Sequence, residues 1–321
     1  MEAREEDMKT ISDQTKRRNR VITLLLQGFL AIILLVVLFQ FVSLSDVKQA
    51  LLSSKPEYIV GAALLMIVNI GFQVLKWRYF VRLVDPTATS LETAASLLFG
   101  ITLGVMTPGQ IGEFGGRALH HGSISAGSIV GLTLVDKVQM LCIMGISGVI
   151  CLVILFPCGE IVGTIISVVA ASMFLFVFFR LNALQRFMSR FNLKFLERPS
   201  IQDFLSAVSI FRSRNLIVSF GLSAGFYIVI YLQMFLLLNA FSPVHAGDAF
   251  VGFGAMMFLK SLVPISLGDL GIREASSVYF YALRGIANAT ALNASLLLFA
   301  INILLPSLMG LIFIPRSRSN D

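Results

Sequence analysis

Long apolar runs separated by short polar connections organise the chain. Six of these runs are long enough to cross a hydrocarbon core of about 30 Å as helices. They cover residues 21–44, 58–75, 126–156, 161–179, 216–241 and 285–314. Two further runs, Ala94–Met106 and Ala249–Leu259, are too short to cross. The pattern predicts an all-α integral membrane protein, a polytopic helical bundle with about six full spans plus two re-entrant helical hairpins.

Composition supports a membrane protein and changes the meaning of the net charge. Of 321 residues, 56% are hydrophobic and only 13% are charged, against about 25% charged in soluble domains. The formal net charge is +7, but the basic residues mostly flank apolar runs, where they determine topology. We therefore expect no nucleic-acid partner. The first 20 residues are polar and the run after them is too long for a signal-peptide core, so we expect it to remain as an anchor.

Basic segments predict the topology of the single transmembrane domain over residues 21–314. Three segments are expected in the cytoplasm: the tail 1–20 with six basic and five acidic residues, the loop 180–215 with seven basic and two acidic residues, and the tail 315–321. Lys76-Trp77-Arg78 is typical of the cytoplasmic end of a membrane span. Lys48 and Lys55, which this orientation places on the outer side, argue against it. The first hairpin, about 91–123, then enters from the cytoplasm and the second from the opposite face, which makes an inverted repeat.

A ten-residue motif occurs once in each predicted hairpin, 156 positions apart. The chain reads Pro-Gly-Gln-Ile-Gly-Glu-Phe-Gly-Gly-Arg from Pro108 and Pro-Ile-Ser-Leu-Gly-Asp-Leu-Gly-Ile-Arg from Pro264. The shared positions are Pro108, Gly112, Glu113, Gly115 and Arg117 in the first copy and Pro264, Gly268, Asp269, Gly271 and Arg273 in the second. A duplicated carboxylate and arginine in so apolar a chain suggests two halves of one site near the membrane midplane.

The chemistry of the motif suits a phosphate group. An arginine within the bilayer costs at least ~2.5 kcal/mol, so it should face protein or water, and a guanidinium fork beside free backbone N–H groups favours phosphate. The expected substrate-binding residues are Arg117, Arg273, Glu113, Asp269, Glu274, Asp136, Lys137 and Lys260. The residues expected to shape the backbone are Pro108, Gly112, Gly115, Pro264, Gly268 and Gly271. No catalytic residue, metal site or cofactor is expected.

Plainer interpretations stay open for several of these residues. Each carboxylate and arginine, spaced i and i+4, could simply pin its hairpin as an internal ion pair. Lys260 could extend to the membrane surface. His120 and His121, beside the first motif, are weaker candidates for substrate contact.

At these residues the chain resembles the lysylphosphatidylglycerol synthase transmembrane-region family, the flippase-like domain of multiple peptide resistance factor proteins. The likeness covers roughly residues 20–314. The residues that show it are Lys76-Trp77-Arg78, Thr107–Glu113 with Arg117, the pair Asp136-Lys137 where the family often has Glu-Arg, and Pro264–Glu274. The resemblance implies a multi-pass inner-membrane protein that moves a lipid head group between leaflets. Nothing in the chain resembles the soluble aminoacyl-transfer domain, so the family name does not describe an expected activity.

The expected function is a flippase for a phospholipid or polyprenyl-phosphate lipid, with both termini in the cytoplasm of a cell. Its partner would be that lipid. Because no glycine-rich nucleotide-binding motif ending in lysine is present, the lipid would move either with a coupling proton or cation, as a second partner, or simply downhill. Two alternatives remain: an intramembrane glycosyl- or phosphotransferase acting on polyprenyl phosphate, and a non-transporting scaffold for a lipid-modifying enzyme.

Overall fold

The computed structural model describes residues 54–107, 109–121, 123–157, 159–179, 198–211, 213–263 and 271–314. Helices and turns account for these residues, and no strand occurs among them, which confirms the predicted all-α class for this part of the chain. The predicted first span, both tails and residues 180–197 of the basic loop lie outside the described residues. So do Pro108, Pro264, Gly268 and Asp269 of the two motifs.

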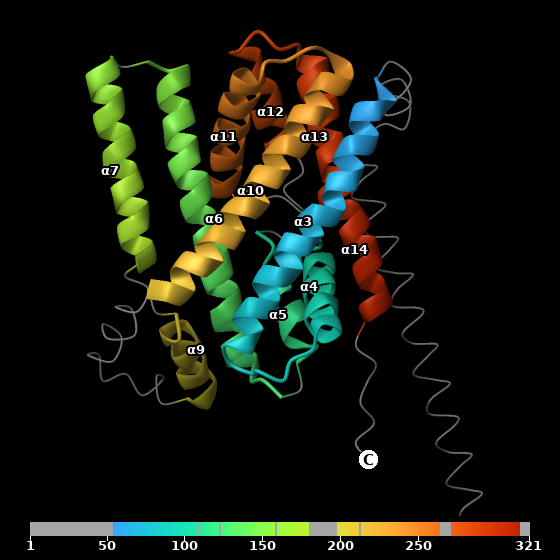
Figure 1. The fold of residues 1–321 in the computed structure, drawn as a ribbon, viewed down its shortest axis with the longest axis vertical. Coiled ribbons are helices and arrows are strands. Elements are labelled where there is room, and N and C mark those ends of the chain that lie inside the picture. The colour runs from blue at the N-terminus through green and yellow to red at the C-terminus, as the bar shows by residue number, and fades with distance from the viewer. Residues whose placement is uncertain are drawn as a thin grey trace, which may run out of the picture.

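Four helical runs are long and apolar enough to cross a membrane within the described part. They are α3 (Pro56–Arg82), α6 (Ala126–Leu155), α10 (Ser213–Phe241) and the C-terminal run from Asn288 to Phe313. These runs correspond to four of the six predicted spans. A fifth predicted span forms α7 (Glu160–Phe179), which packs on α6 at the edge of the bundle (Figure 1).

Each short apolar run forms a helical hairpin with the motif that follows it. α4 (Ser90–Val105) packs on α5 (Gly112–Ala118), and α11 (Ala246–Leu262) packs on α12 (Ile272–Ala282). The hydroxyl of Thr89 caps α4 by accepting the Glu92 N–H at 3.2 Å, as expected for threonine at this position. Figure 1 shows the two hairpins in opposite halves of the molecule, with α4 and α5 low and α11 and α12 high.

The two hairpins pack against each other's long helices. α11 packs on α6, the helix after the first hairpin, and α14 (Leu305–Gly310), after the second hairpin, packs on α4. α3 and α10 pack on each other between them. Glycine permits close approach at both exchanged contacts: a Cβ on Gly148 would lie 2.1 Å from the Phe258 side chain, and one on Gly310 would lie 2.3 Å from the Leu98 carbonyl oxygen.

The last predicted span is a broken helix rather than a regular one. It runs as α13 (Asn288–Phe299), a π-helical turn η2 (Ala300–Leu304), α14 and a final 3₁₀ turn η3 (Leu311–Phe313). Pro306 has no N–H to give the carbonyl four residues earlier, at Asn302, as an α-helix requires. The chain instead passes through a π turn, in which the Leu305 N–H bonds the Ala300 carbonyl.

The described part of the basic loop contains α9 (Pro199–Ser209), which packs on α6. The contact is close, because a Cβ on Gly127 would lie 2.1 Å from the Ser200 carbonyl oxygen. Figure 1 shows α9 at the low end of α6. The described part of the loop predicted as cytoplasmic therefore lies in the half of the molecule that holds the first hairpin.

Candidate functional site

Arg117 and four other charged side chains form a continuous network that is mostly buried. Arg117 is 2% exposed; it donates to Asp136 Oδ2 at 2.9 Å and also forms an ion pair with Glu113. Lys76 lies 2.6 Å from Asp136 Oδ1, and Lys137 pairs with the second oxygen of Glu113. Two carboxylates thus hold three cations, drawn from α3, α5 and α6. Such a set is stable only when its partners are complete.

Neighbouring helices fix Arg117 on the side away from the carboxylates. Its guanidinium lies 4.3 Å from the centre of the Trp77 ring, a cation–π contact. The Trp77 indole N–H donates to the Ser96 hydroxyl at 3.2 Å, which donates to the Arg117 carbonyl at 3.0 Å. Gly100 leaves room for the arginine stem, since a Cβ there would lie 2.6 Å from Arg117 Cγ. α3 and α4 therefore hold α5 in register.

The prediction that Lys76-Trp77-Arg78 forms a membrane boundary is wrong for its first two residues. Lys76 and Trp77 are 4% and 1% exposed, and α3 continues beyond the predicted end at Leu75 to Arg82. A lysine and a tryptophan after an apolar run give the same sequence pattern whether they face lipid head groups or a buried carboxylate. The missing partner, Asp136, lies 60 positions away.

Arg273 in the second hairpin has a similar setting. It pairs with Glu274, with Nε donating to Oε1 at 3.0 Å and to the Ser295 hydroxyl at 3.3 Å. Its guanidinium lies 5.0 Å from the centre of the Phe299 ring. Glu274 also accepts the Gly271 N–H at 2.7 Å. Gly271, with φ of +86°, has the left-handed backbone that favours glycine.

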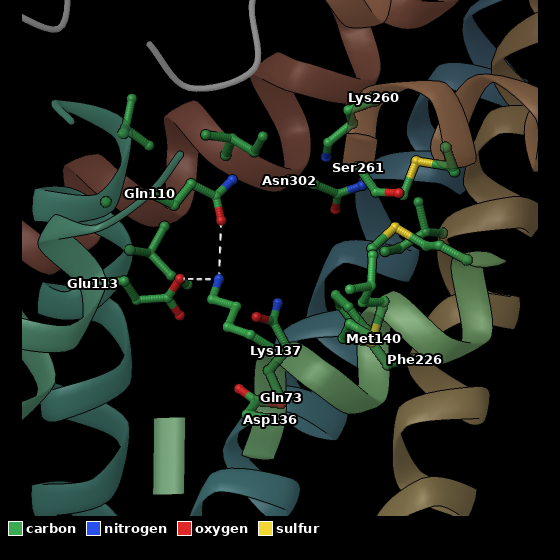
Figure 2. A pocket seen from close by; sticks show the side chains of 18 of the residues that line it. Gln73, Gln110, Glu113, Asp136, Lys137, Met140, Phe226, Lys260, Ser261 and Asn302 are labelled. Carbon is green, nitrogen blue, oxygen red and sulfur yellow. Dashed lines mark hydrogen bonds and ion pairs between the residues drawn. The ribbon is translucent and has the colours of Figure 1, made fainter. Parts of the chain in front are cut away.

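One cavity of about 360 Å³ brings the two halves together. Its lining includes these charged side chains: Lys76, Glu113, Arg117, Asp136, Lys137, Lys260 and Arg273. Five are basic and two are acidic. Counting Glu274, which pairs with Arg273 outside the lining, leaves an excess of two positive charges among these described residues. Figure 2 shows Glu113 and Gln110 on one side of the opening and Lys260 with Asn302 on the other.

Lys137 and Lys260, rather than Lys76 or the arginines, are the basic groups with the most access to this volume. The side chain of Lys137 is 34% exposed against 2% for Arg117 and 3% for Arg273. Lys137 Nζ also donates to Gln110 Oε1 at 3.0 Å, and Lys260 is half-buried in the lining. Both ammonium groups point into the opening in Figure 2. This position argues against the interpretation of Lys260 as a side chain that reaches the membrane surface.

The glycines of the motif differ in what they do. A Cβ on Gly112 would lie 2.2 Å from the Leu103 carbonyl oxygen, whereas a Cβ on Gly115 would meet nothing within 4 Å. Gly115 also lacks a positive φ. Neither lack of space for a side chain nor a left-handed backbone therefore requires glycine at this position. The turn before Gly112 is held by its N–H bond to the Thr107 hydroxyl at 2.7 Å. Gly109 and Gln110, with φ of 62° and 58°, form the unusual part of that turn.

Several lining residues carry no signal in the motifs. Asn69 and Gln73 on α3 and Asn302 in the π turn line the cavity as uncharged polar groups. Met140, Met144, Phe226, Ile230 and Met257 form an apolar wall. The spacing from Asn302 to Pro306 is the one sequence signal that marks the π turn. His120 and His121 follow α5 and are not part of this lining.

Outside the helices, the loop between α3 and α4 contacts the end of the first hairpin. Asp85 accepts hydrogen bonds from Thr87 and, at 2.7 Å, from Ser123. These hydrogen bonds, that of Thr87 most of all, lower the pKa of the Asp85 carboxyl below its ordinary value. The loop thus keeps its link to the hairpin as an ionised acceptor at neutral pH.

Comparison with known proteins supports the resemblance seen in the motifs. A comparison with curated proteins finds no match. The family model described as "Lysylphosphatidylglycerol synthase TM region" matches residues 24–310, which include every helix that lines the cavity. With most of its length matched, the chain belongs to the lysylphosphatidylglycerol synthase transmembrane-region family, as a multi-pass membrane protein.

Proposed function

We propose that this protein moves a phosphate-bearing lipid, a phospholipid or a polyprenyl-phosphate lipid, between the leaflets of the cell membrane. The observation that carries the proposal is the shared cavity, to which the first half contributes Arg117 and Lys137 and the second Lys260 and Arg273. Phosphate is the head-group component that an excess of buried positive charge favours. The apolar wall beside the charges suits the glycerol and first acyl carbons.

The charges have separate tasks in this mechanism. Lys137 and Lys260 approach the open volume from opposite sides and would receive the phosphate between them. Arg117 and Arg273 also line the cavity but are paired with carboxylates, and would hold Glu113 and Glu274 in place. Glu113 would release Lys137 to the lipid or take up a coupling proton. Asp269 lies outside the described residues, and its binding role stays a prediction.

The hairpins in opposite halves favour an inverted repeat with alternating access. Transporters built in this way carry their site at the interface of the repeats, near the midplane. α9 and the end of α14 lie in the same half of the molecule as the first hairpin. That arrangement agrees with a cytoplasmic first hairpin, cytoplasmic loop 180–215 and cytoplasmic termini. We propose that the domain 21–314 itself catalyses no reaction and moves lipid downhill or with an ion gradient.

Loss of the Lys260 charge should slow lipid movement by at least about tenfold, because a charge-assisted hydrogen bond contributes about 1.5–3 kcal/mol. The change is Lys260→Met, which removes the charge and keeps most of the length of the side chain. The measurement is the rate at which fluorescent head-group lipids change leaflet in proteoliposomes, with and without an imposed proton gradient.

The matched control is Arg284→Gln. Arg284 belongs to the same half but pairs with Asp248 at the surface and is not part of the cavity lining, so its loss should leave the rate unchanged. Equal rates for the intact protein and Lys260→Met would contradict the role of the cavity. An intact protein that moves no lipid in a panel of phospholipids and polyprenyl phosphates would contradict the proposed function itself.

A further inference from the structure

Four amide side chains form a hydrogen-bonded row beside the cavity. Asn69, Gln73 and Asn302 belong to the cavity lining, and the fully buried Gln233 links Asn69 to Asn302. Gln73 Nε2 donates to Asn69 Oδ1 at 2.8 Å, and Asn69 Nδ2 donates to Gln233 Oε1 at 3.3 Å. Gln233 and Asn302 then exchange two hydrogen bonds, at 3.0 and 2.8 Å. The row crosses from α3 through α10 to the π turn. Its outer members, Gln73 and Asn302, line the same cavity as Lys137, Asp136 and Lys260, and Figure 2 labels all five around the opening.

The two ends of this row keep hydrogen-bonding capacity on the cavity side. An amide offers two donors and one carbonyl acceptor. Within the described residues, Gln73 uses a single N–H, which leaves its carbonyl oxygen and second N–H. Asn302 uses one N–H and its carbonyl oxygen, both toward Gln233. Gln73 and Asn302 both line the cavity, so the free groups are on the wall that a ligand would meet.

The π turn is what brings Asn302 into the row. Pro306 prevents a regular α-helix at this point, and π turns of this kind are frequent at functional sites. Apolar packing alone could join α3 to α10 at a lower cost in free energy, because a buried polar network is costly unless every member is satisfied. The chain instead uses a broken helix to place the Asn302 amide in the cavity wall.

The state of the carboxylates decides which head group fits. A cationic head group requires an available carboxylate, but the two carboxylates in the described part of the lining, Glu113 and Asp136, each already hold two basic side chains. Glu274 holds Arg273 and caps the Gly271 N–H. Amides with both a donor and an acceptor to offer instead match hydroxyl groups, which are themselves donors and acceptors.

From this arrangement we infer that the amide row is a head-group subsite for hydroxyl groups next to the phosphate. The substrate class is a lipid phosphodiester whose head group is an uncharged polyol, a glycerol or a sugar. The inference rests on the proposed function, since it assumes that the phosphate lies between Lys137 and Lys260. Gln73 and Asn302 act as specificity-determining contacts and the apolar wall receives the lipid stem.

The test measures binding separately from transport. Trp77 is the only tryptophan in the chain and lies against Arg117, so its fluorescence reports on the charged end of the cavity. Dioctanoyl phosphatidylglycerol, phosphatidylinositol, phosphatidic acid and phosphatidylethanolamine are titrated against the purified full chain, with glycerol 3-phosphate as the free source of the same head-group chemistry. Phosphatidylglycerol and phosphatidylinositol should bind at least about fivefold tighter than the other two lipids, because one hydrogen bond contributes about 1 kcal/mol.

The Gln73→Met variant should reduce this preference to within about twofold while phosphatidic acid binds as before. Gln139→Met is the matched control: Gln139 also joins two helices by buried hydrogen bonds, to Ser219 at 2.5 Å and Ser223 at 3.0 Å, but is not part of the lining. It should keep the full preference, so a loss in both variants would overturn the assignment of the preference to the amide row.

The intact protein tests the inference even if Gln73→Met does not fold. Phosphatidylethanolamine or phosphatidic acid binding as tightly as phosphatidylglycerol would overturn the polyol subsite. Glycerol 3-phosphate binding as tightly as the lipid would assign the site to a free phosphate ester instead. A preserved order of binding with no lipid movement in proteoliposomes would overturn the proposed function and leave the subsite standing.

Discussion

Replacing Asp136 alone by leucine should destabilise the protein by about 3–5 kcal/mol, the cost of leaving a buried ion pair without one partner. Asp136 is 5% exposed and holds both Lys76 and Arg117. Without it, the one partner that Lys76 keeps among the described residues is the Phe226 ring, at 5.4 Å, and Arg117 keeps Glu113. The measurement is the apparent free energy of unfolding in mixed micelles, titrated with a denaturing detergent.

A double replacement separates the loss of charge balance from the loss of one residue. Lys76→Met with Asp136→Leu removes one charge of each sign, so we expect it to recover most of the stability that Asp136→Leu loses. The surface pair is the control: Asp248→Leu removes a carboxylate whose partner Arg284 is 35% exposed, and should cost no more than about 1 kcal/mol. A double variant as unstable as Asp136→Leu would show that Lys76 and Asp136 are not energetically coupled.

The stability and the rate of lipid movement of the double variant together show what Lys76 and Asp136 do. If Lys76 and Asp136 act only to hold the helices, the stable double variant should move lipid at the normal rate. If their charges also shape the potential that the phosphate meets, the double variant should be stable and slow. The cavity geometry favours the second outcome, since both residues belong to its lining.

The sequence predicts the charged part of this site better than its polar part. The two motifs stand out because an arginine and a carboxylate are rare in apolar runs, and the structure joins Arg117, Glu113, Asp136 and Lys137 in one network. A charge in the membrane requires a partner, so charged residues within apolar runs can be grouped by their chemistry alone. Which residue pairs with which still depends on the packing: Arg273 uses its neighbour Glu274.

Uncharged polar residues carry no comparable signal. Asn69 and Gln73 lie in α3 and Gln233 lies in α10, and an uncharged amide in an apolar helix costs too little to demand a particular partner. Their row exists only because α3 and α10 pack side by side next to the π turn. The same reason explains Lys76, whose boundary-like surroundings in the sequence give no hint of Asp136. Tertiary contacts between distant segments supply this part of the site.

Replacing Gly112 in the first motif should also have a large effect. Gly112→Ala should destabilise the protein by about 3 kcal/mol, the upper end of the usual range for overpacking substitutions. A Cβ at this position would lie 2.2 Å from the Leu103 carbonyl oxygen and 2.9 Å from the Thr107 hydroxyl. That hydroxyl accepts the Gly112 N–H. The obstructing oxygen belongs to the backbone of α4, so no side-chain rotation relieves the contact and the hairpin itself must open.

Gly115→Ala is the matched control for Gly112→Ala, because Gly115 lies in the same short helix with no atom in the way. Alanine is about 1 kcal/mol better than glycine inside a helix, so this variant should be as stable as the intact protein or more so. Detergent titration of both variants measures the difference, and equal stability would contradict the close packing of α4 on α5. Glu113 and Arg117 belong to the helix that Gly112→Ala displaces, whereas Asp136 and Lys137 remain on α6. We therefore expect lipid movement to fail in Gly112→Ala even under conditions in which the protein is still folded, because the displaced arginine no longer meets Asp136.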